Sequence, residues 1–225
     1  MKIASPPSRI PSTAVRRPAN RRERHRTETR ARLYRAALDL FAERGFMETT
    51  VEDITEAADV GKGTFFNYFP TKEHVLAAYG GERVARVQQA LEEARSTKRP
   101  VHEVIRELAA DSAGQSKENP ALLRAIFAAH VSCVPVRVEL QKRMRVARRA
   151  LARIFALAQE RGEMRRDLST AEIARVTQVA LMGTCMVWAL HPEYSLRKTS
   201  LELWDLMWPS LAQPAVASRP EKLGA

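Results

Sequence analysis

The chain has 225 residues, a formal net charge of +11 and a sequence pI near 10.2, and 45% of its residues are hydrophobic. This length suits one large or two small domains with a sizeable core, and the charge favours an anionic partner. Two distant cysteines, Cys133 and Cys185, exclude a disulfide framework or a metal motif, and no uninterrupted apolar run reaches the ~18 residues of a membrane span. We therefore expect a cytoplasmic protein with no membrane association, no metal and no cofactor.

The positive charge gathers at the N-terminus. Residues 1–32 hold ten Lys and Arg against two Glu. Within them, residues 1–26 are rich in Pro, Ser and Arg and show no periodicity, which predicts a disordered basic arm. Such an arm would strengthen DNA binding, although a solubilising tail or a wrongly assigned start codon would give the same composition. At the other end, residues 213–225 are expected to form a flexible tail.

Residues 27–71 are predicted to form a unit of three helices. In the first helix, Leu33, Ala37 and Phe41 fall on one face, which is typical of a helix packed against a core. Gly45 follows the last periodic position. Glycine adopts the left-handed conformation without strain, so it is expected to end this helix.

A second helix of about two turns is expected after the threonines of "TTVEDI". Thr50 with Asp53, or Thr49 with Glu52, has the spacing of a capping box, in which both side chains accept backbone N–H groups. The link that follows, "DVG", has the length of the turn in a helix-turn-helix.

The third helix is predicted at residues 62–69, "KGTFFNYF". At 100° per residue, Phe65 and Phe69 point to the core, while Gly63 and Asn67 point away from it. Gly and Asn are weak helix formers, so their presence on the outer face indicates close approach to another surface.

Two short helices with a small, polar outer face on the second predict a helix-turn-helix that enters the major groove of DNA. Thr64 and Asn67 would reach base edges, because an Asn amide matches adenine with two hydrogen bonds. Lysine and hydroxyl groups nearby would contact phosphates. The expected DNA-binding residues are Thr49, Thr50, Lys62, Gly63, Thr64, Asn67, Tyr68 and Lys72.

The stretch "GKGT" also resembles part of a phosphate-binding loop for a nucleotide. That interpretation is disfavoured because Glu56 stands where the motif requires a glycine, and because no strand precedes it.

The remaining chain, residues 72–212, is predicted to be a larger helical domain. Prolines stand at or near its joints and strand-like alternation is absent, so the expected fold class is all-α. The expected helices cover residues 72–95, 101–114, 120–132, 137–161, 170–190 and 196–211.

Residues 33–76 closely resemble the DNA-binding domain of the tetracycline-repressor (TetR) family of bacterial regulators. The resemblance rests on the helix end A-x-x-L-F-x-x-x-G-F, on T-T-V-x-x-I, and on the aromatic helix followed by F-P-x-K-E. It implies a homodimer in which each N-terminal domain reads one half of a palindromic operator in double-stranded DNA. It also implies a C-terminal domain that forms the dimer and binds a small effector. Such regulators mostly repress transcription and release DNA when the effector binds.

Three positions depart from the pattern of the family. Asp59 stands where a glycine is usual, and some strain is expected because Asp tolerates the left-handed region less well. Gly61 replaces a serine, which removes a good N-cap. Phe66 replaces a tyrosine in many members, which removes a hydroxyl.

The two last predicted helices are apolar over much of their circumference, with Trp204, Trp208 and Leu211 at helical spacing. A four-helix bundle made by two chains would bury them on both sides, whereas burial within one chain is the alternative.

The resemblance places an effector pocket between the helix at 72–95 and the middle helices. Its apolar lining predicts a small hydrophobic or amphipathic effector, although the same side chains could form core. A second hypothesis is that this domain binds a protein partner. No catalytic residues are recognisable, so no enzyme activity is expected. The candidate pocket residues are Phe127, His130, Met144, Met182, Met186 and Trp188.

Overall fold

The computed structural model describes residues 21–111 and 119–213, and the secondary structure in these ranges is helical apart from one isolated bridge between Met164 and Ala212. The predicted all-α class is confirmed. The helices are α1 (Arg21–Arg44), α2 (Val51–Ala57), α3 (Lys62–Phe66), α4 (Lys72–Ser96), α5 (Val101–Asp111), α6 (Pro120–Ser132), α7 (Val134–Glu160), α8 (Thr170–Leu190) and α9 (Leu196–Leu211).

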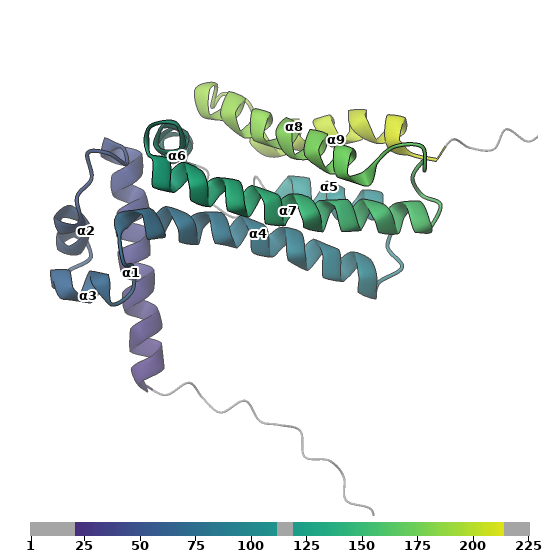
Figure 1. The fold of residues 1–225 in the computed structure, drawn as a ribbon. Helices are drawn as coiled ribbons and strands as arrows, with labels where there is room; N and C mark the ends of the chain where they lie inside the picture. Colours follow the sequence, from purple (N-terminus) through teal and green to yellow (C-terminus); the bar gives the residue numbers. More distant parts are fainter. Residues whose placement is uncertain (1–20, 112–118, 214–225) are drawn as a thin grey trace, which may run out of the picture.

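Helices α1 to α3 form one end of the molecule, and α4 runs from that end along the larger helical domain (Figure 1). Helix α4 lies beside α7 for most of its length, while α8 and α9 lie on the other side of α7. A movement of α4 would therefore be passed directly to the small N-terminal unit.

Helix α1 begins at Arg21, earlier than the predicted start at residue 27. Residues 21–26, "RRERHR", are helical because Arg and Glu are good helix formers and Glu23 lies in the first turn, where a negative charge is favourable. The first 20 residues of the expected basic arm lie outside the described residues. The helix ends as predicted, since Gly45 has φ +91° and its N–H donates to the Phe41 carbonyl at 3.0 Å.

The start of α2 confirms the capping box of Thr50 and Asp53. The Asp53 N–H donates to the Thr50 hydroxyl oxygen at 3.1 Å, and the Thr50 N–H donates to the Asp53 carboxylate at 2.8 Å. Helix α3 is shorter than predicted and ends at Phe66. The N–H groups of Tyr68 and Phe69 both donate to the Phe65 carbonyl at 2.9 Å, so the chain tightens there instead of continuing the helix.

The turn between α2 and α3 contains the strain expected from the sequence. Asp59 has φ +50° and is the one described residue other than glycine with a positive φ. A side chain in the left-handed region costs about 1–2 kcal/mol in steric energy, although Asp tolerates it better than most residues.

Replacing Asp59 with Gly is expected to raise the free energy of unfolding by about 0.5–1 kcal/mol, because relief of the strain exceeds the added flexibility of the unfolded chain. The thermal unfolding midpoint measures this change. Asp59→Ala is the matched control: it removes the same charge but keeps the Cβ atom, so it should not stabilise. Equal stabilisation by both variants would assign the effect to the charge.

Two hydrophobic clusters hold the chain together, and they lie at opposite ends of the long helices. The first joins α1, α2 and α3 with α6, the N-terminal part of α4 and the C-terminal end of α8. The second joins α5 and α9 with the C-terminal parts of α4 and α7 and the N-terminal part of α8. The middle stretches of α4, α7 and α8 therefore lie between the two clusters.

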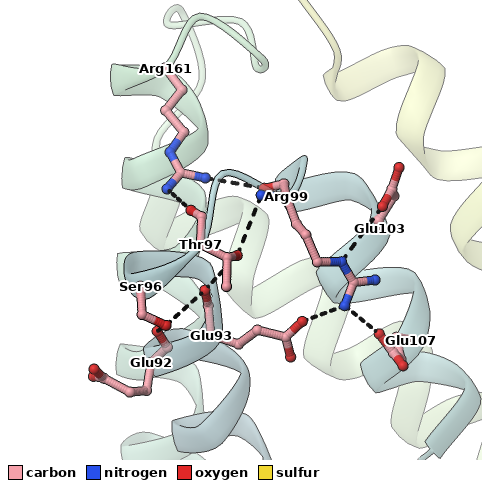
Figure 2. A network of polar contacts seen from close by, with 8 residues as sticks. All are labelled: Glu92, Glu93, Ser96, Thr97, Arg99, Glu103, Glu107 and Arg161. Carbon is pink, nitrogen blue, oxygen red and sulfur yellow. Dashed lines mark hydrogen bonds and ion pairs between the residues drawn. The ribbon is translucent and has the colours of Figure 1, made fainter.

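The C-terminal end of α4 is fastened to α7 and α5 by polar contacts (Figure 2). The Arg161 guanidinium donates to the carbonyls of Ala94, Thr97 and Arg99 at 2.6, 2.9 and 3.2 Å. Arg99 in turn pairs with Glu93, Glu103 and Glu107, as Figure 2 shows. Arg161 supplies donors to carbonyls that the end of a helix leaves without partners, which fixes this end of α4.

Candidate DNA-binding surface and effector cavity

The outer face of α3 carries the small residues that the sequence predicted. Phe65 is fully buried beneath it and Phe69 is 2% exposed. Gly63 and Asn67 are exposed and Thr64 is half-buried. A side chain at position 63 would point into open space, because no atom lies within 4 Å of the Cβ position. This face can therefore approach a flat or grooved partner without a steric barrier from the protein itself.

Three further candidates lie around this face. Thr50 is exposed, and its hydroxyl group is already bonded to Asp53 at 2.7 Å. Lys62 is exposed and forms an ion pair with Glu52, whose carboxyl pKa is lowered by the hydrogen bond from the Lys62 ammonium. A phosphate would have to compete with Glu52 for this lysine. Tyr68 is half-buried and packs partly against the core.

Two predicted phosphate contacts donate to backbone carbonyls of the protein instead. Thr49 is fully buried, and its hydroxyl donates to the Gly45 carbonyl at 2.8 Å, so its prediction as a DNA contact is wrong. The Lys72 ammonium donates to the carbonyls of Phe46, Met47 and Thr49 at 2.9, 3.2 and 2.9 Å. It also lies 4.7 Å above the centre of the Phe46 ring. Because all three donors of Lys72 have acceptors, this lysine fastens α4 to the loop between α1 and α2.

A cavity of about 620 Å³ lies along α4 from Glu73 to Val87, and it is bounded also by α6, α7 and α8 and by Leu108 of α5. This volume lies within the range of small-molecule sites. Four predicted residues line it, namely Phe127, His130, Met144 and Met182. The cavity occupies the region between the two hydrophobic clusters, where neither cluster fills the space between the helices.

The other two predicted pocket residues, Met186 and Trp188, do not line the cavity. On α8 the lining residues are Gln178, Met182 and Cys185. At 100° per residue, Met186 and Trp188 lie roughly 80° to either side of that face. Met186 is 50% exposed, whereas Trp188 is 7% exposed and packs in the cluster that contains α1 and α6.

Polar groups in the cavity were missed by sequence analysis. Arg83 donates to the Tyr79 hydroxyl at 3.1 Å and lies 5.4 Å above the centre of the same ring. Arg143 pairs with Glu139 at 2.7 Å. Charged residues on a helix usually face water, so nothing local in the sequence marks these two arginines as lining.

Two buried nitrogen atoms in the cavity wall, His130 Nδ1 and Arg143 Nε, have no hydrogen-bond partner among the described residues. Burial lowers the pKa of His130, so its imidazole is neutral at physiological pH. Buried polar atoms are normally satisfied, so each of these two nitrogen atoms can bond a water molecule or a ligand in the cavity.

Residues 33–79 match the family model described as "Bacterial regulatory proteins, tetR family". The HTH-type transcriptional repressor DhaR of Mycobacterium sp. (strain GP1) is 44% identical over 57 residues, which are 25% of this chain and 27% of DhaR. The HTH-type transcriptional regulator TcmR of Streptomyces glaucescens is 48% identical over 54 residues, 24% of each protein. The match thus spans about a quarter of the length of these curated relatives.

A solved structure extends the similarity over the larger helical domain. The TetR-family transcriptional repressor FadR of Thermus thermophilus, in complex with lauroyl-CoA, is 30% identical to this chain. The alignment covers 87% of this chain and 100% of FadR, with a TM-score of 0.61.

Proposed function

This chain belongs to the TetR family of DNA-binding transcriptional regulators, and from that premise we propose that it is a homodimeric repressor released from a palindromic operator by a small hydrophobic or amphipathic effector. Residues 27–71 form the DNA-binding domain, residues 72–212 form the effector and dimerisation domain, and the protein works in the cytoplasm. The observation that carries the proposal is the cavity beside α4, which lies between the small outer face of α3 and the fastened end of α4.

DNA recognition is assigned to the exposed face of α3. Asn67 and Thr64 read base edges, and Gly63 lets the helix approach the groove closely. Thr50, Lys62 and Tyr68 contact phosphates around it. The basic residues before α1 add a contact that does not depend on base sequence.

The effector acts through two helices that it touches. Helix α4 lines the cavity and is tied to the DNA-binding unit by Lys72, while its far end is held by Arg161. Helix α6 lines the cavity on one face and packs in the cluster with α1 on another. An effector that favours a wider cavity would displace the N-terminal part of α4 and the unit attached to it. Because half-sites lie about 34–36 Å apart, a change of a few ångströms would weaken binding to both together.

The cavity supports a small ligand over the alternative, in which this domain binds a protein partner. Its wall is mostly apolar, and FadR, a relative with a similar structure, was crystallised with lauroyl-CoA. An effector with a substantial apolar part follows from both observations.

Selection of bound duplexes from a random DNA pool tests the proposal. We expect an operator with two inverted half-sites whose centres lie one helical turn apart or a multiple of it. A single half-site without symmetry would contradict the homodimer model.

Replacing Asn67 with Ala is expected to weaken binding to the selected operator about tenfold and to relax the base preference at one position of each half-site. Asn67 is exposed, so the thermal unfolding midpoint should not change. Gln88→Ala removes an exposed amide from α4 and serves as the control. Fluorescence anisotropy on the operator and on single-base variants measures both effects. An unchanged base preference would remove Asn67 from base recognition.

A further inference from the structure

We propose that the effector of this cavity carries an anionic oxygen group on an apolar body, and that Arg83 and Arg143 hold that group. The inference rests on the proposed function, because it names the chemical class of the effector. Two sources of the anion, a carboxylate and a phosphate, share this chemistry.

The first argument is the uncompensated charge of Arg83. Its guanidinium is bonded to the Tyr79 hydroxyl and also contacts the Cys185 thiol, and no ion pair with a carboxylate within residues 21–111 and 119–213 includes it. A guanidinium is always charged at physiological pH, and a cation at an apolar wall is costly unless a negative charge lies beside it. An anionic ligand would supply that charge.

The second argument is the space that two glycines of α4 leave for the side chain of Arg143. A Cβ atom at Gly81 would lie 2.7 Å from Arg143 Nη1, and one at Gly80 would lie 3.1 Å from Arg143 Cδ. Two adjacent glycines inside a helix cost about 1 kcal/mol each in helix stability. The pair allows Arg143 to lie across the backbone of α4, at the wall of the cavity.

The bonding of Arg143 leaves part of its guanidinium for a ligand. One Nη atom pairs with Glu139, while Nε has no partner. Guanidinium groups bind carboxylates and phosphates with two parallel hydrogen bonds, so a partly satisfied arginine at a cavity wall suits such a group.

The charges of the whole lining also favour an anion. Three arginines and two glutamates line the cavity, together with two histidines of which His130 is neutral. Arg86 donates to the Asp111 carbonyl at 3.1 Å, and no carboxylate of the described residues pairs with it. The charged lining residues are Glu73, Arg83, Arg86, Glu139 and Arg143.

Binding of three ligands with the same ten-carbon chain tests the proposal: decanoate, decyl phosphate and the neutral decanamide. Titration calorimetry with the full chain is expected to show that at least one anion binds about tenfold or more tightly than decanamide. The dissociation constants of decanoate and decyl phosphate show whether the site prefers a carboxylate or a phosphate. Equal binding of all three, or no binding by any of them, would overturn the inference.

The variants locate the anion within the cavity. Arg83→Met should abolish the preference for the anion while decanamide still binds, and Arg145→Met, an exposed arginine on α7, is the matched control. Gly81→Ala keeps every charged group but displaces the Arg143 guanidinium, so it should reduce the preference even if Arg83→Met folds poorly. If both variants still bind the anion more tightly than decanamide by the original ratio, the inference is also overturned. Tight binding of decanamide without any preference would leave the proposed regulator intact, whereas failure to select an operator would count against the regulator itself.

Discussion

Replacing Lys72 with Met is expected to lower the free energy of unfolding by about 2–4 kcal/mol and to leave the salt dependence of DNA binding unchanged. The ammonium group donates to three carbonyls between Phe46 and Thr49 and lies over the Phe46 ring. Methionine fills a similar volume but donates no hydrogen bond, so these carbonyls would lose their partner. The result separates a fastening role for Lys72 from a phosphate contact.

Two measurements on the same variant decide between these roles. The first is unfolding by urea, which gives the loss of stability. The second is operator affinity at several salt concentrations, because each lost phosphate contact lowers the slope of log K against log salt by about one. Affinity itself should fall, since the DNA-binding unit would no longer be held firmly to α4.

Lys62→Met is the matched control for Lys72→Met. Lys62 is exposed and contacts Glu52 alone among the described groups, so its removal should change stability little. If Lys62 contacts phosphate, the Lys62→Met variant will show a smaller slope of log K against log salt than the unchanged protein. The opposite pattern, with a smaller slope and unchanged stability for Lys72→Met, would restore Lys72 as a phosphate contact.

The sequence predicted the features of the DNA-binding unit that depend on neighbours along the chain. Leu33, Ala37 and Phe41 are fully buried as their spacing indicated, and the left-handed conformation at Asp59 follows from its place in a short turn. The capping box of Thr50 and Asp53 is equally local. Such features depend on helix geometry over a few residues, and a single sequence contains that information.

Features that depend on contacts across the chain could not be predicted in this way. Lys72 was expected at the surface because the pattern of α4 does not reveal that three carbonyls of an earlier loop converge on it. Arg83 and Arg143 are charged residues on amphipathic helices, which normally indicates a solvated face. Trp188 was expected to line the pocket, but it packs in the hydrophobic cluster that contains residues of α6.

Helix α8 presents an apolar surface that the described residues of the chain leave exposed. Val179, Met186 and Leu190 are 59%, 50% and 59% exposed and recur at helical spacing, and Leu206 of the adjacent α9 is 81% exposed. By length and composition α8 could also cross a membrane, with a mean hydropathy of 1.4 over 18 residues. In a DNA-binding regulator, a second copy of the chain is the better explanation for an exposed apolar row on two adjacent helices.

Replacing Met186 with Glu is therefore expected to convert the homodimer into a monomer and to abolish measurable binding to a palindromic operator. In the proposed homodimer, two-fold symmetry would bring the same α8 surface of both chains together. One substitution would then introduce two like charges into an apolar contact, and each charge would have to lose water on association. A monomer reaches one half-site only, and the affinity gained from linking two half-sites disappears. Light scattering coupled to size-exclusion chromatography measures the mass, with circular dichroism to verify that the helices remain.

The control for Met186→Glu is Val131→Glu, which places the same charge at a 78% exposed apolar residue near the end of α6. This variant should remain dimeric, because α6 is not part of the proposed interface. The two variants differ only in which exposed apolar surface receives the charge, so general solubility effects cancel between them. A dimeric Met186→Glu would exclude the α8 surface as the interface, and a monomeric Val131→Glu would move the interface to the side of α6.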